Sequence, residues 1–325
     1  PHGRDARTVA EFGIGTNDHD QFADNNLIED VWIWASGERI IAINYRSHNN
    51  VWRRVVVRGD GCGDLANCNG RGNPNVGITV YDSNNISLQN VIVVDRVLAA
   101  GDEPYSDFAV AQHTPDARYY FGQNEWLGTM SIKAPDAGYQ MEPDAGATLD
   151  PTIKISNAVA WNAAADLGFN LARAGTNNLL ETLTVIASGF DGIRVAPELT
   201  TGTLRNAIVA GAGTFGINSK YAPTFVDVFN AAGGDYNQTT CSGVCFTTDP
   251  QADTPGPSLK FLTRIEDGSL LKGAGSGGAD IGANILFRYG ADGSRFGETD
   301  YNTLSAVSLW PWPNQDRIKK EMCVD

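Results

Sequence analysis

A sequence motif that recurs with a period of 24 residues is the strongest constraint on how this chain can fold. The motif starts with two small polar residues and continues into an alternating aliphatic run. NNLIEDVWIWA from Asn25 and NNVWRRVVVRG from Asn49 start 24 residues apart, as do NNLLETLTVIA from Asn177 and TGTLRNAIVAG from Thr201. Repeats of about 20 to 50 residues are typical of stacked architectures. We therefore expect the chain to be built from stacked, similar units.

The repeat has the period of β-strands. Aliphatic side chains alternate along each unit, Val and Ile are frequent, and Gly and Asn mark the turns, whereas no helical pattern of useful length intervenes. A second series of short strands follows glycines that are again 24 residues apart, Gly168, Gly192 and Gly216. Two or three short strands per unit predict one coil of a parallel β-helix, whose coils pair about 4.8 Å apart. The repeat predicts an all-β solenoid of roughly eight coils.

The alternation predicts which side chains face the interior. In the first strand series these are Val31, Ile33, Val55, Val57, Val91, Val93, Leu183, Val185, Ala207 and Val209, and in the second they are Ile78, Val80, Phe169, Leu171, Ile193 and Val195. Outward positions of the first series are also apolar and include Trp32 and Trp34. Large apolar patches seldom stay bare, so we expect residues 97–150, or a neighbouring molecule, to cover this stripe. The alternative role for the two tryptophans is sugar binding by stacking.

The paired asparagine turns and the Gly-Ile-x-Val strands resemble those of secreted right-handed parallel β-helix repeat proteins, the pectate-lyase-like superfamily. The resemblance covers roughly residues 25–230, and the tail with GADIGAN resembles the end segment of such proteins. It implies an N-terminal segment (1–24), a right-handed β-helix (25–250) with a lateral insertion (97–150), and a C-terminal coil closure and cap (251–325). It does not specify an activity, because the fold hosts lyases, hydrolases, epimerases, adhesins and fibre proteins.

Charge and hydropathy limit the partners. The net charge of −14 and the pI of about 4.6 predict a surface that repels nucleic acids and anionic lipids. No apolar run approaches the length of about 18 residues that a membrane span needs. A strongly anionic polysaccharide would need bridging cations or a local basic patch. We expect no nucleic-acid partner and no membrane span.

Five cysteines bear on the compartment. Cys62 and Cys68 enclose a loop rich in Gly and Asn, and Cys241 and Cys245 enclose Ser-Gly-Val. These polar, turn-like segments favour two short disulfides over buried thiols or a zinc site. Disulfides predict an oxidising, extracellular location. Cys323 is left over, and an odd cysteine can pair between chains.

One outward face carries candidate chemistry. Asn170, Arg194 and Asn218 are 24 residues apart and should stack, with Asp166 and Asp191 near them. Lyase chemistry needs a base near the C5 proton of a uronate sugar and positive charge, often Ca²⁺, on its carboxylate. If the chain is a lyase, Arg194 is the candidate catalytic base, and Asn170, Asn218 and Asp191 bind the glycan. The alternative is that Arg194 only pairs with Asp191 or is solvated.

A second candidate is the loop NDHDQFADNN from Asn17. It contains Asp18 and Asp20 among amide side chains, and oxygen-rich loops of this kind can bind Ca²⁺. The alternative is an ordinary solvated loop.

Two functions remain from the sequence. The first is an extracellular structural protein whose subunits assemble into a fibre or surface layer, because the active-site motifs of the related hydrolases (NTD, DD and GHG) are absent and the chain starts almost directly on a coil. Unpaired strand edges can join such subunits head to tail. The alternative is a polysaccharide-active enzyme, a uronan lyase in particular.

Overall fold

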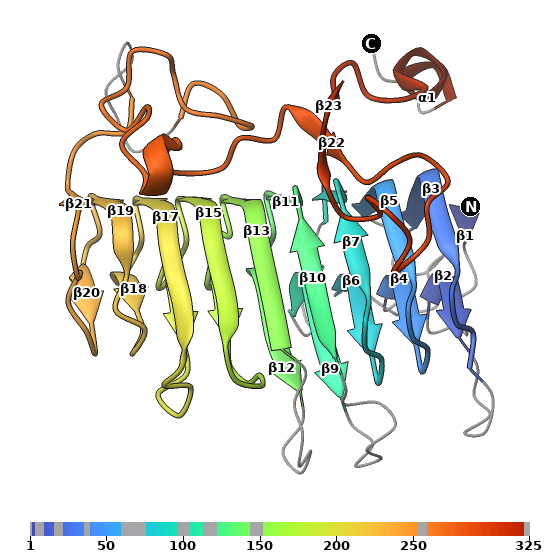
Figure 1. Ribbon diagram of the computed structural model, residues 1–325, viewed down its shortest axis with the longest axis horizontal. Coiled ribbons are helices and arrows are strands. Elements are labelled where there is room, and N and C mark those ends of the chain that lie inside the picture. The colour runs from blue at the N-terminus through green and yellow to red at the C-terminus, as the bar shows by residue number, and fades with distance from the viewer. Residues whose placement is uncertain are drawn as a thin grey trace, which may run out of the picture.

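The computed structural model describes residues 2–3, 10–15, 22–35, 40–59, 76–96, 105–112, 122–143, 152–251 and 259–321. Within these ranges the chain forms two long parallel sheets and a two-stranded antiparallel sheet (Figure 1). Sheet A has 12 strands and sheet B has 9. The chain alternates between them, passing through A and then through B. The predicted all-β fold is therefore confirmed, and the arrangement is compatible with a parallel β-helix.

The strands of sheet A, in spatial order, are β1 (His2–Gly3), β3 (Leu27–Ala35), β5 (Val51–Gly59), β7 (Ser87–Gln89), β10 (Gln123–Leu127), β13 (Thr152–Trp161), β15 (Asn178–Ile186), β17 (Gly202–Ala210), β19 (Thr224–Phe229) and β21 (Cys245–Phe246), with β8 (Ile92–Val94) and β11 (Met130–Ile132) off this path. Those of sheet B are β2 (Ala10–Gly15), β4 (Ile40–Tyr45), β6 (Val76–Tyr81), β9 (Ser106–Gln112), β12 (Ala137–Pro143), β14 (Phe169–Leu171), β16 (Ile193–Val195), β18 (Phe215–Asn218) and β20 (Gly234–Asn237).

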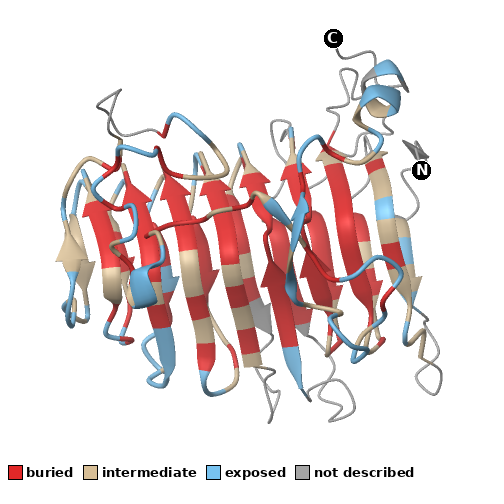
Figure 2. Cartoon of the chain, turned by 45° about the horizontal axis from the view of Figure 1, so that its top comes forward, coloured by how far each residue is buried: buried red, intermediate tan, exposed pale blue. Residues whose placement is uncertain are grey.

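The core lies between the two sheets and consists of stacked aliphatic and aromatic side chains. All predicted inward positions belong to it; every one is buried except Val31, which is partly buried (Figure 2). The 24-residue glycine series has a packing reason. A Cβ atom at Gly192 would overlap the Val209 side chain, and the same holds for Gly168 against Val185 and Gly216 against Val228. At these glycine positions the backbone of sheet B lies so close to the last inward valine of sheet A that no side chain fits.

From β3 to β19, each pass through sheet A contains one residue with left-handed backbone conformation at the bend of the strand. These residues occupy a single register position, and their φ values lie between 48° and 66°: Asp30, Arg54, Asn90, Gly128, Asn157, Thr182, Asn206 and Phe225. Asparagine, aspartate and glycine tolerate this conformation better than other residues, which explains five of the eight positions. The left-handed residue bends the strand and separates it into two arms.

The segment predicted as a lateral insertion contributes strands instead. Residues 106–112 form β9, and residues 123–143 contain β10, β11 and β12, all paired within the two long sheets. The sequence period is longer in this part of the chain: Arg53 bonds Gln89 across 36 residues, and Ser87 bonds Glu125 across 38. A search for a 24-residue spacing therefore passes over these strands.

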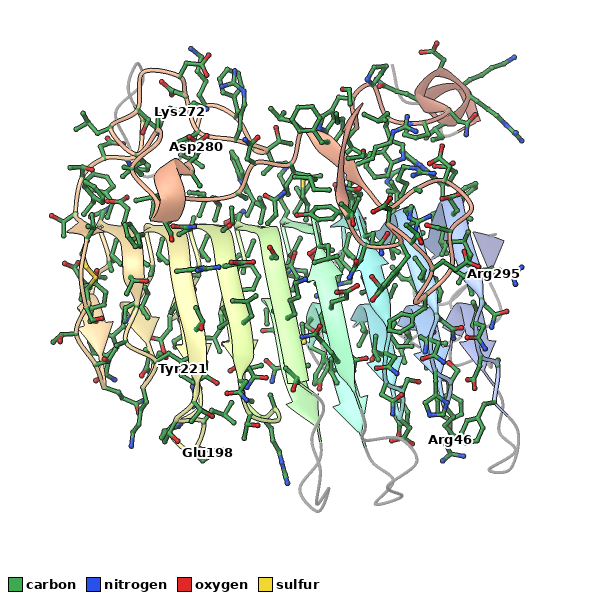
Figure 3. The ribbon with its side chains drawn as sticks, in the orientation of Figure 1. Arg46, Glu198, Tyr221, Lys272, Asp280 and Arg295 are labelled. Atoms are coloured by element: carbon green, nitrogen blue, oxygen red, sulfur yellow. A yellow bond between two sulfur atoms is a disulfide. The ribbon has the colours of Figure 1, made fainter. Side chains whose placement is uncertain are left out.

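The C-terminal segment, residues 259–321, crosses the outer face of sheet A. It returns from the β21 end toward the β3 end, above the strands in Figure 1. It contains β22 (Phe287–Tyr289), β23 (Leu304–Ser308) and the helix α1 (Gln315–Glu321). This differs from the predicted cap over the last coil. A short ion pair between Lys272 and Asp280 (Nζ–Oδ2 2.8 Å) closes one of its loops on the side of β17 and β19 (Figure 3).

The apolar outer stripe of sheet A is what this segment covers. The main cluster contains Val56, Ile92, Met130 and Val159 from the sheet and Ala283, Ile285, Leu309 and Trp312 from the segment. Trp32 packs against the same cluster, which indicates a packing role rather than sugar stacking. A second cluster joins Ile208 to Ile265, Leu271 and Ile281. The cover expected from residues 97–150 is therefore supplied by residues 259–321, because burial of apolar surface stabilises whichever segment can reach it.

Three of the asparagines with left-handed backbone conformation hydrogen-bond the backbone of the C-terminal segment. Asn90 and Asn157 use both the oxygen and the nitrogen of the side-chain amide, and Asn206 uses the oxygen. The bonds are Ser276 N to Asn206 Oδ1 (2.8 Å), Asn284 N to Asn157 Oδ1 (2.6 Å), Asn157 Nδ2 to Asn284 O (2.9 Å), Tyr289 N to Asn90 Oδ1 (2.7 Å) and Asn90 Nδ2 to Phe287 O (3.3 Å). The asparagines that bend the strands of sheet A thus also provide hydrogen-bond partners for backbone N–H and C=O groups of the C-terminal segment.

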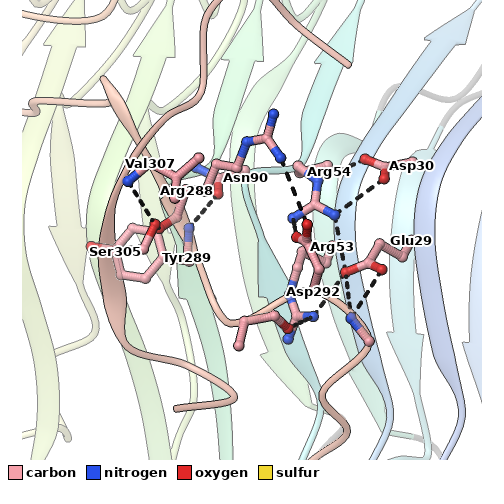
Figure 4. A network of polar contacts seen from close by, with 12 residues as sticks. Glu29, Asp30, Arg53, Arg54, Asn90, Arg288, Tyr289, Asp292, Ser305 and Val307 are labelled. Atoms are coloured by element: carbon pink, nitrogen blue, oxygen red, sulfur yellow. Dashed lines mark hydrogen bonds and ion pairs between the residues drawn. The ribbon is translucent and has the colours of Figure 1, made fainter. Parts of the chain in front are cut away.

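Buried charges fix the far end of the segment (Figure 4). Arg53 is fully buried and donates to Glu29 Oε1 at 2.9 Å and to the carbonyl oxygens of Ala291 (2.6 Å) and Tyr301 (2.9 Å). Arg54 is 1% exposed and pairs with Asp30, Glu29 and Asp292. Burial opposes and these three carboxylates favour its charged form, and the net effect raises the pKa of Arg54.

A buried carboxyl group beneath the segment should make stability depend on pH. Asp227 on β19 is fully buried, and burial, with Asp249 and Asp235 adding, raises its pKa to about 7, although Thr248 N–H donates to Oδ1 at 3.0 Å. The folded protein then binds this proton more tightly than the unfolded chain, whose reference value is 3.8. We expect the unfolding free energy to fall as the pH rises between these two values and to level off above the higher one.

Thermal unfolding measured across this pH range tests the expectation. Asp227→Asn removes the titrating group and should flatten the fall and raise the unfolding temperature at pH values above about 7. A variant with the same pH dependence as the natural sequence would show that Asp227 does not titrate in this window.

Candidate functional site

The candidate site lies on the outer face of sheet B, which the C-terminal segment does not share. The strand register places Gln140, Asn170, Arg194 and Asn218 side by side on β12, β14, β16 and β18. The structure therefore brings together the three residues that the 24-residue spacing predicted to stack. Gln140 joins them as a fourth member.

The amides of this row form two separate hydrogen-bonded pairs. Asn170 Nδ2 donates to Gln140 Oε1 at 2.7 Å, and Gln238 Nε2 donates to Asn218 Oδ1 at 2.6 Å. Arg194 is exposed between the two pairs. Asn170 is 7% exposed, yet its Oδ1 atom has no hydrogen-bond partner among the described residues. A buried acceptor without a donor is costly, and this oxygen is covered by the protein in the structure.

Asp191 has a different role from the one the sequence suggested. Its Oδ1 accepts bonds from the Thr214 hydroxyl and from Phe215 N (3.1 Å), and its Oδ2 accepts one from Asn218 Nδ2 (2.8 Å). Both carboxylate oxygens are therefore engaged by the next coil. Asp191 positions the turn before β18 and orients the Asn218 amide.

Two aspartates meet in the turns that lead into β12 and β14. Asp136 and Asp166 occupy the same register position, between the backbone bonds Ala164 N to Ala134 O (3.1 Å) and Gly138 N to Leu167 O (3.0 Å). Burial raises the pKa of Asp166 to about 6; the Asp136 charge adds to this and the Arg194 charge opposes it. Burial also raises the pKa of Asp136. Both carboxyls therefore keep their protons to higher pH than an ordinary aspartate, and the charge on Asp136 affects the titration of Asp166.

An exposed aromatic residue is bonded through its backbone to the turn that carries Asp166. Phe190 is 52% exposed, and its backbone N–H donates to Asp166 O at 3.1 Å. An exposed ring beside carboxyl, guanidinium and amide groups can pack against the apolar face of a sugar. The sequence analysis did not single out Phe190, Asp136 or Gln140. Asn170 and Gln140 are 30 residues apart, so the fixed spacing of 24 could not find the β12 members of the site.

A buried ion pair lies behind the site. Arg96 and Asp107 have no exposed side-chain surface, and Arg96 Nε lies 2.7 Å from Asp107 Oδ1. Ser131 Oγ donates to Asp107 Oδ2 at 2.6 Å. Burial raises the pKa of Asp107, and the Arg96 charge opposes this.

The remaining predicted site residues fall elsewhere. Cys241 and Cys245 form a disulfide with Cα atoms 6.3 Å apart. Cys62, Cys68, Cys323, Asp18 and Asp20 lie outside the described residues. Within the described ranges, no group of three or more His, Cys, Asp or Glu side chains is arranged to hold a metal ion.

In comparisons with known proteins, no family model matches the chain and no curated protein matches it. Of the helices that the structure describes, none has both the length and the apolar character needed to cross a membrane.

Proposed function

We propose that the chain is an extracellular polysaccharide-active enzyme, in which sheets A and B close into a right-handed parallel β-helix and the outer face of sheet B binds the glycan. The regular alternation of the chain between two parallel sheets supports the helix, and the Cys241–Cys245 disulfide supports an oxidising compartment. The function is assigned to the corner of the site where Asp136, Asp166 and Arg194 meet.

The observation that carries this proposal is the pair of in-register carboxyls, Asp136 and Asp166, beside an exposed arginine. Cleavage of a glycosidic bond uses one carboxyl as an acid and a second, ionised carboxylate on the other side of the bond. Enzymes obtain the acid by raising the pKa of one carboxyl through burial and a like charge. Asp166, with its pKa of about 6, has the properties of the acid, and Asp136, whose charge Arg96 favours against the effect of burial, is assigned the role of the ionised partner.

Arg194 is assigned a charge-stabilising role in this proposal. An arginine side chain stays protonated in proteins and cannot accept the C5 proton of a uronate sugar. Its exposed guanidinium can instead bind a sugar carboxylate, which the acidic chain offers few other groups to do. In a lyase reaction the ionised Asp136 carboxylate would take the C5 proton while the bond from C4 to the leaving oxygen breaks and Asp166 donates its proton to that oxygen. The two reactions leave different products: reducing ends alone, or ends with a C4–C5 double bond.

Asp166→Asn is expected to lower activity on the responsive glycan by about 100- to 10,000-fold, because it removes the proton-transfer group and preserves the shape of the side chain. The measurement is release of reducing ends and of near-ultraviolet absorbance from polygalacturonate, alginate and a neutral xylan. Absorbance together with reducing ends identifies a lyase, and reducing ends alone identify a hydrolase.

The matched control is Asp267→Asn, since Asp267 is an exposed aspartate on the C-terminal segment, far from the site in the fold. It should retain full activity. An Asp166→Asn chain as active as the control, with the fold intact, would remove Asp166 from the reaction; no product from a broad panel of glycans would count against the enzyme.

A second candidate function, assembly into a fibre or surface layer, is favoured by one observation. The β22–β23 hairpin exposes several large apolar side chains: Phe287 (38%), Leu304 (47%), Val307 (55%) and Trp310 (36%). An exposed apolar strand edge can pair with a second copy of the chain. Light scattering at high protein concentration distinguishes the two ideas, since assembly requires particles larger than the monomer and should be abolished by Val307→Lys.

A further inference from the structure

The ion pair behind the site replaces a packing contact that is repeated elsewhere. In neighbouring coils a glycine of sheet B faces the last inward side chain of sheet A, as in Gly192 against Val209. At the position of β9 and β11 the same two places hold Asp107 and Ser131, joined by their 2.6 Å hydrogen bond. Arg96 completes the group through its 2.7 Å contact with Asp107. A charged group in place of a glycine–valine contact costs stability unless it is fully paired, which calls for a reason beyond packing.

The buried Arg96–Asp107 ion pair lies next to the turn that carries Asp136, one of the two carboxyls of the candidate site. Asp107 on β9 is in register with Gly138 on β12, two residues after Asp136. The turn that carries Asp136 is bonded to the same strand through Ala137 N to Tyr105 O (3.4 Å). The guanidinium of Arg96, anchored on Asp107, therefore lies on the Asp136 side of the carboxyl pair. Arg194 lies on the other side, on β16 next to Asp166's own strand β14.

We propose that Arg96 is a positioning residue that decides which of the two carboxyls releases its proton first: it favours the ionised form of Asp136 and leaves the proton on Asp166. This inference rests on the proposed function for its catalytic meaning, but the proton assignment itself does not require any activity.

The charges that face each group support the assignment. Asp136 is faced by Arg96 and by Asp166, whereas Asp166 is faced by Asp136, Asp191 and Arg194. Arg194 favours the ionised form of Asp166, so without another charge Asp166 would be the first of the two carboxyls to ionise. Arg96 acts in the opposite direction because it stabilises the charge on Asp136, and the resulting like charge raises the pKa of Asp166. Without Arg96, the proton should move to Asp136.

The test is a titration of the carboxyl carbons of both aspartates by ¹³C NMR in the natural sequence, Arg96→Gln and Arg96→Lys. In the natural sequence the higher apparent pKa should belong to Asp166. In Arg96→Gln it should pass to Asp136, and the midpoint of Asp166 should fall by about one pH unit or more, the size expected for loss of a neighbouring charge. Arg96→Lys keeps the charge and should keep the natural order. An Arg96→Gln chain that retains the natural order overturns the proposal.

Because Arg96→Gln leaves Asp107 without its counter-charge, the variant can fail to fold, and a second variant keeps the test decisive. Asp136→Asn leaves the buried pair intact and should lower the midpoint of Asp166 toward the ordinary value for aspartate; an unchanged midpoint overturns the coupling on which the proposal depends. The outcome is separable from that of the proposed function. A proton that moves as expected while Asp166→Asn keeps full activity on glycans sinks the enzyme alone, and the reverse result sinks only the role of Arg96.

Discussion

A Val209→Asp chain is expected not to fold. Val209 is fully buried in the core between the sheets, and its side chain fills the space left by Gly192 on the facing strand. Its two neighbours in the register, Val185 and Val228, offer a carboxylate at this position neither a side-chain donor nor a cation. An unpaired ion in such an interior costs several kcal/mol even after relaxation, and whole domains are stable by only about 5–15 kcal/mol. The variant should be recovered as aggregate or as unfolded chain.

The matched control is Thr203→Asp, the same new residue on the same strand at an exposed position. It should cost about 1 kcal/mol or less, the range of β-propensity differences. Circular dichroism and denaturant unfolding of both variants make the comparison. Equal damage at the two positions would mean that the inward and outward faces of β17 are assigned wrongly.

The fold was predictable where the period is regular. Between β14 and β18 the strand register repeats every 24 residues, and inward side chains that share a register position are aliphatic or aromatic because they stack on one another across adjacent strands. The strands β9 to β12 could not be found in this way. Repeats there take 29 to 38 residues, and longer connections displace the pattern without altering the stacking that it serves.

The path of the C-terminal segment was not predictable from periodicity. Its sequence indicates an extended segment rich in glycine. It does not indicate which residues the segment contacts, because these are spread over the whole length of sheet A. Two signals were nevertheless present. The outward apolar stripe required a cover, and the asparagines at 90, 157 and 206 stand at one register position with amides free to bond a passing backbone. Once these asparagines are known to share one register position, the extended C-terminal segment is the expected partner for their amides.

The candidate site was half visible in the sequence. Asn170, Arg194 and Asn218 follow the regular period, so their row could be inferred, and the structure places them in register. Asp136 and Gln140 belong to the irregular coils. The properties of Asp166 come from burial and from the Asp136 charge, neither of which a single sequence reveals.

Arg53→Met is expected to destabilise the protein by about 3–5 kcal/mol, the usual cost of removing one partner of a buried ion pair. Arg53 has no exposed side-chain surface, and its loss removes the donor to the Ser294 carbonyl oxygen and one of the donors to those of Ala291 and Tyr301. The methionine fills most of the volume, so the loss measures the missing charge and hydrogen bonds. The C-terminal segment should lose its attachment first, because these three carbonyls all belong to it. Hydrogen exchange should therefore rise in residues 285–309 before it rises in sheet A.

Arg205→Met is the control for this prediction, since Arg205 occupies the same register column of sheet A as Arg53 and also pairs with a glutamate. Its Nη2 lies 2.7 Å from Glu181 Oε2, but its side chain is 41% exposed and it makes no bond to the C-terminal segment among the described residues. An exposed pair of this kind contributes about 0–1 kcal/mol. Denaturant unfolding should thus separate two substitutions that are identical in chemistry and in strand position. If both variants lost the same free energy of unfolding, or if the segment kept its protection in Arg53→Met, the buried arginine would not be what attaches the C-terminal segment to sheet A.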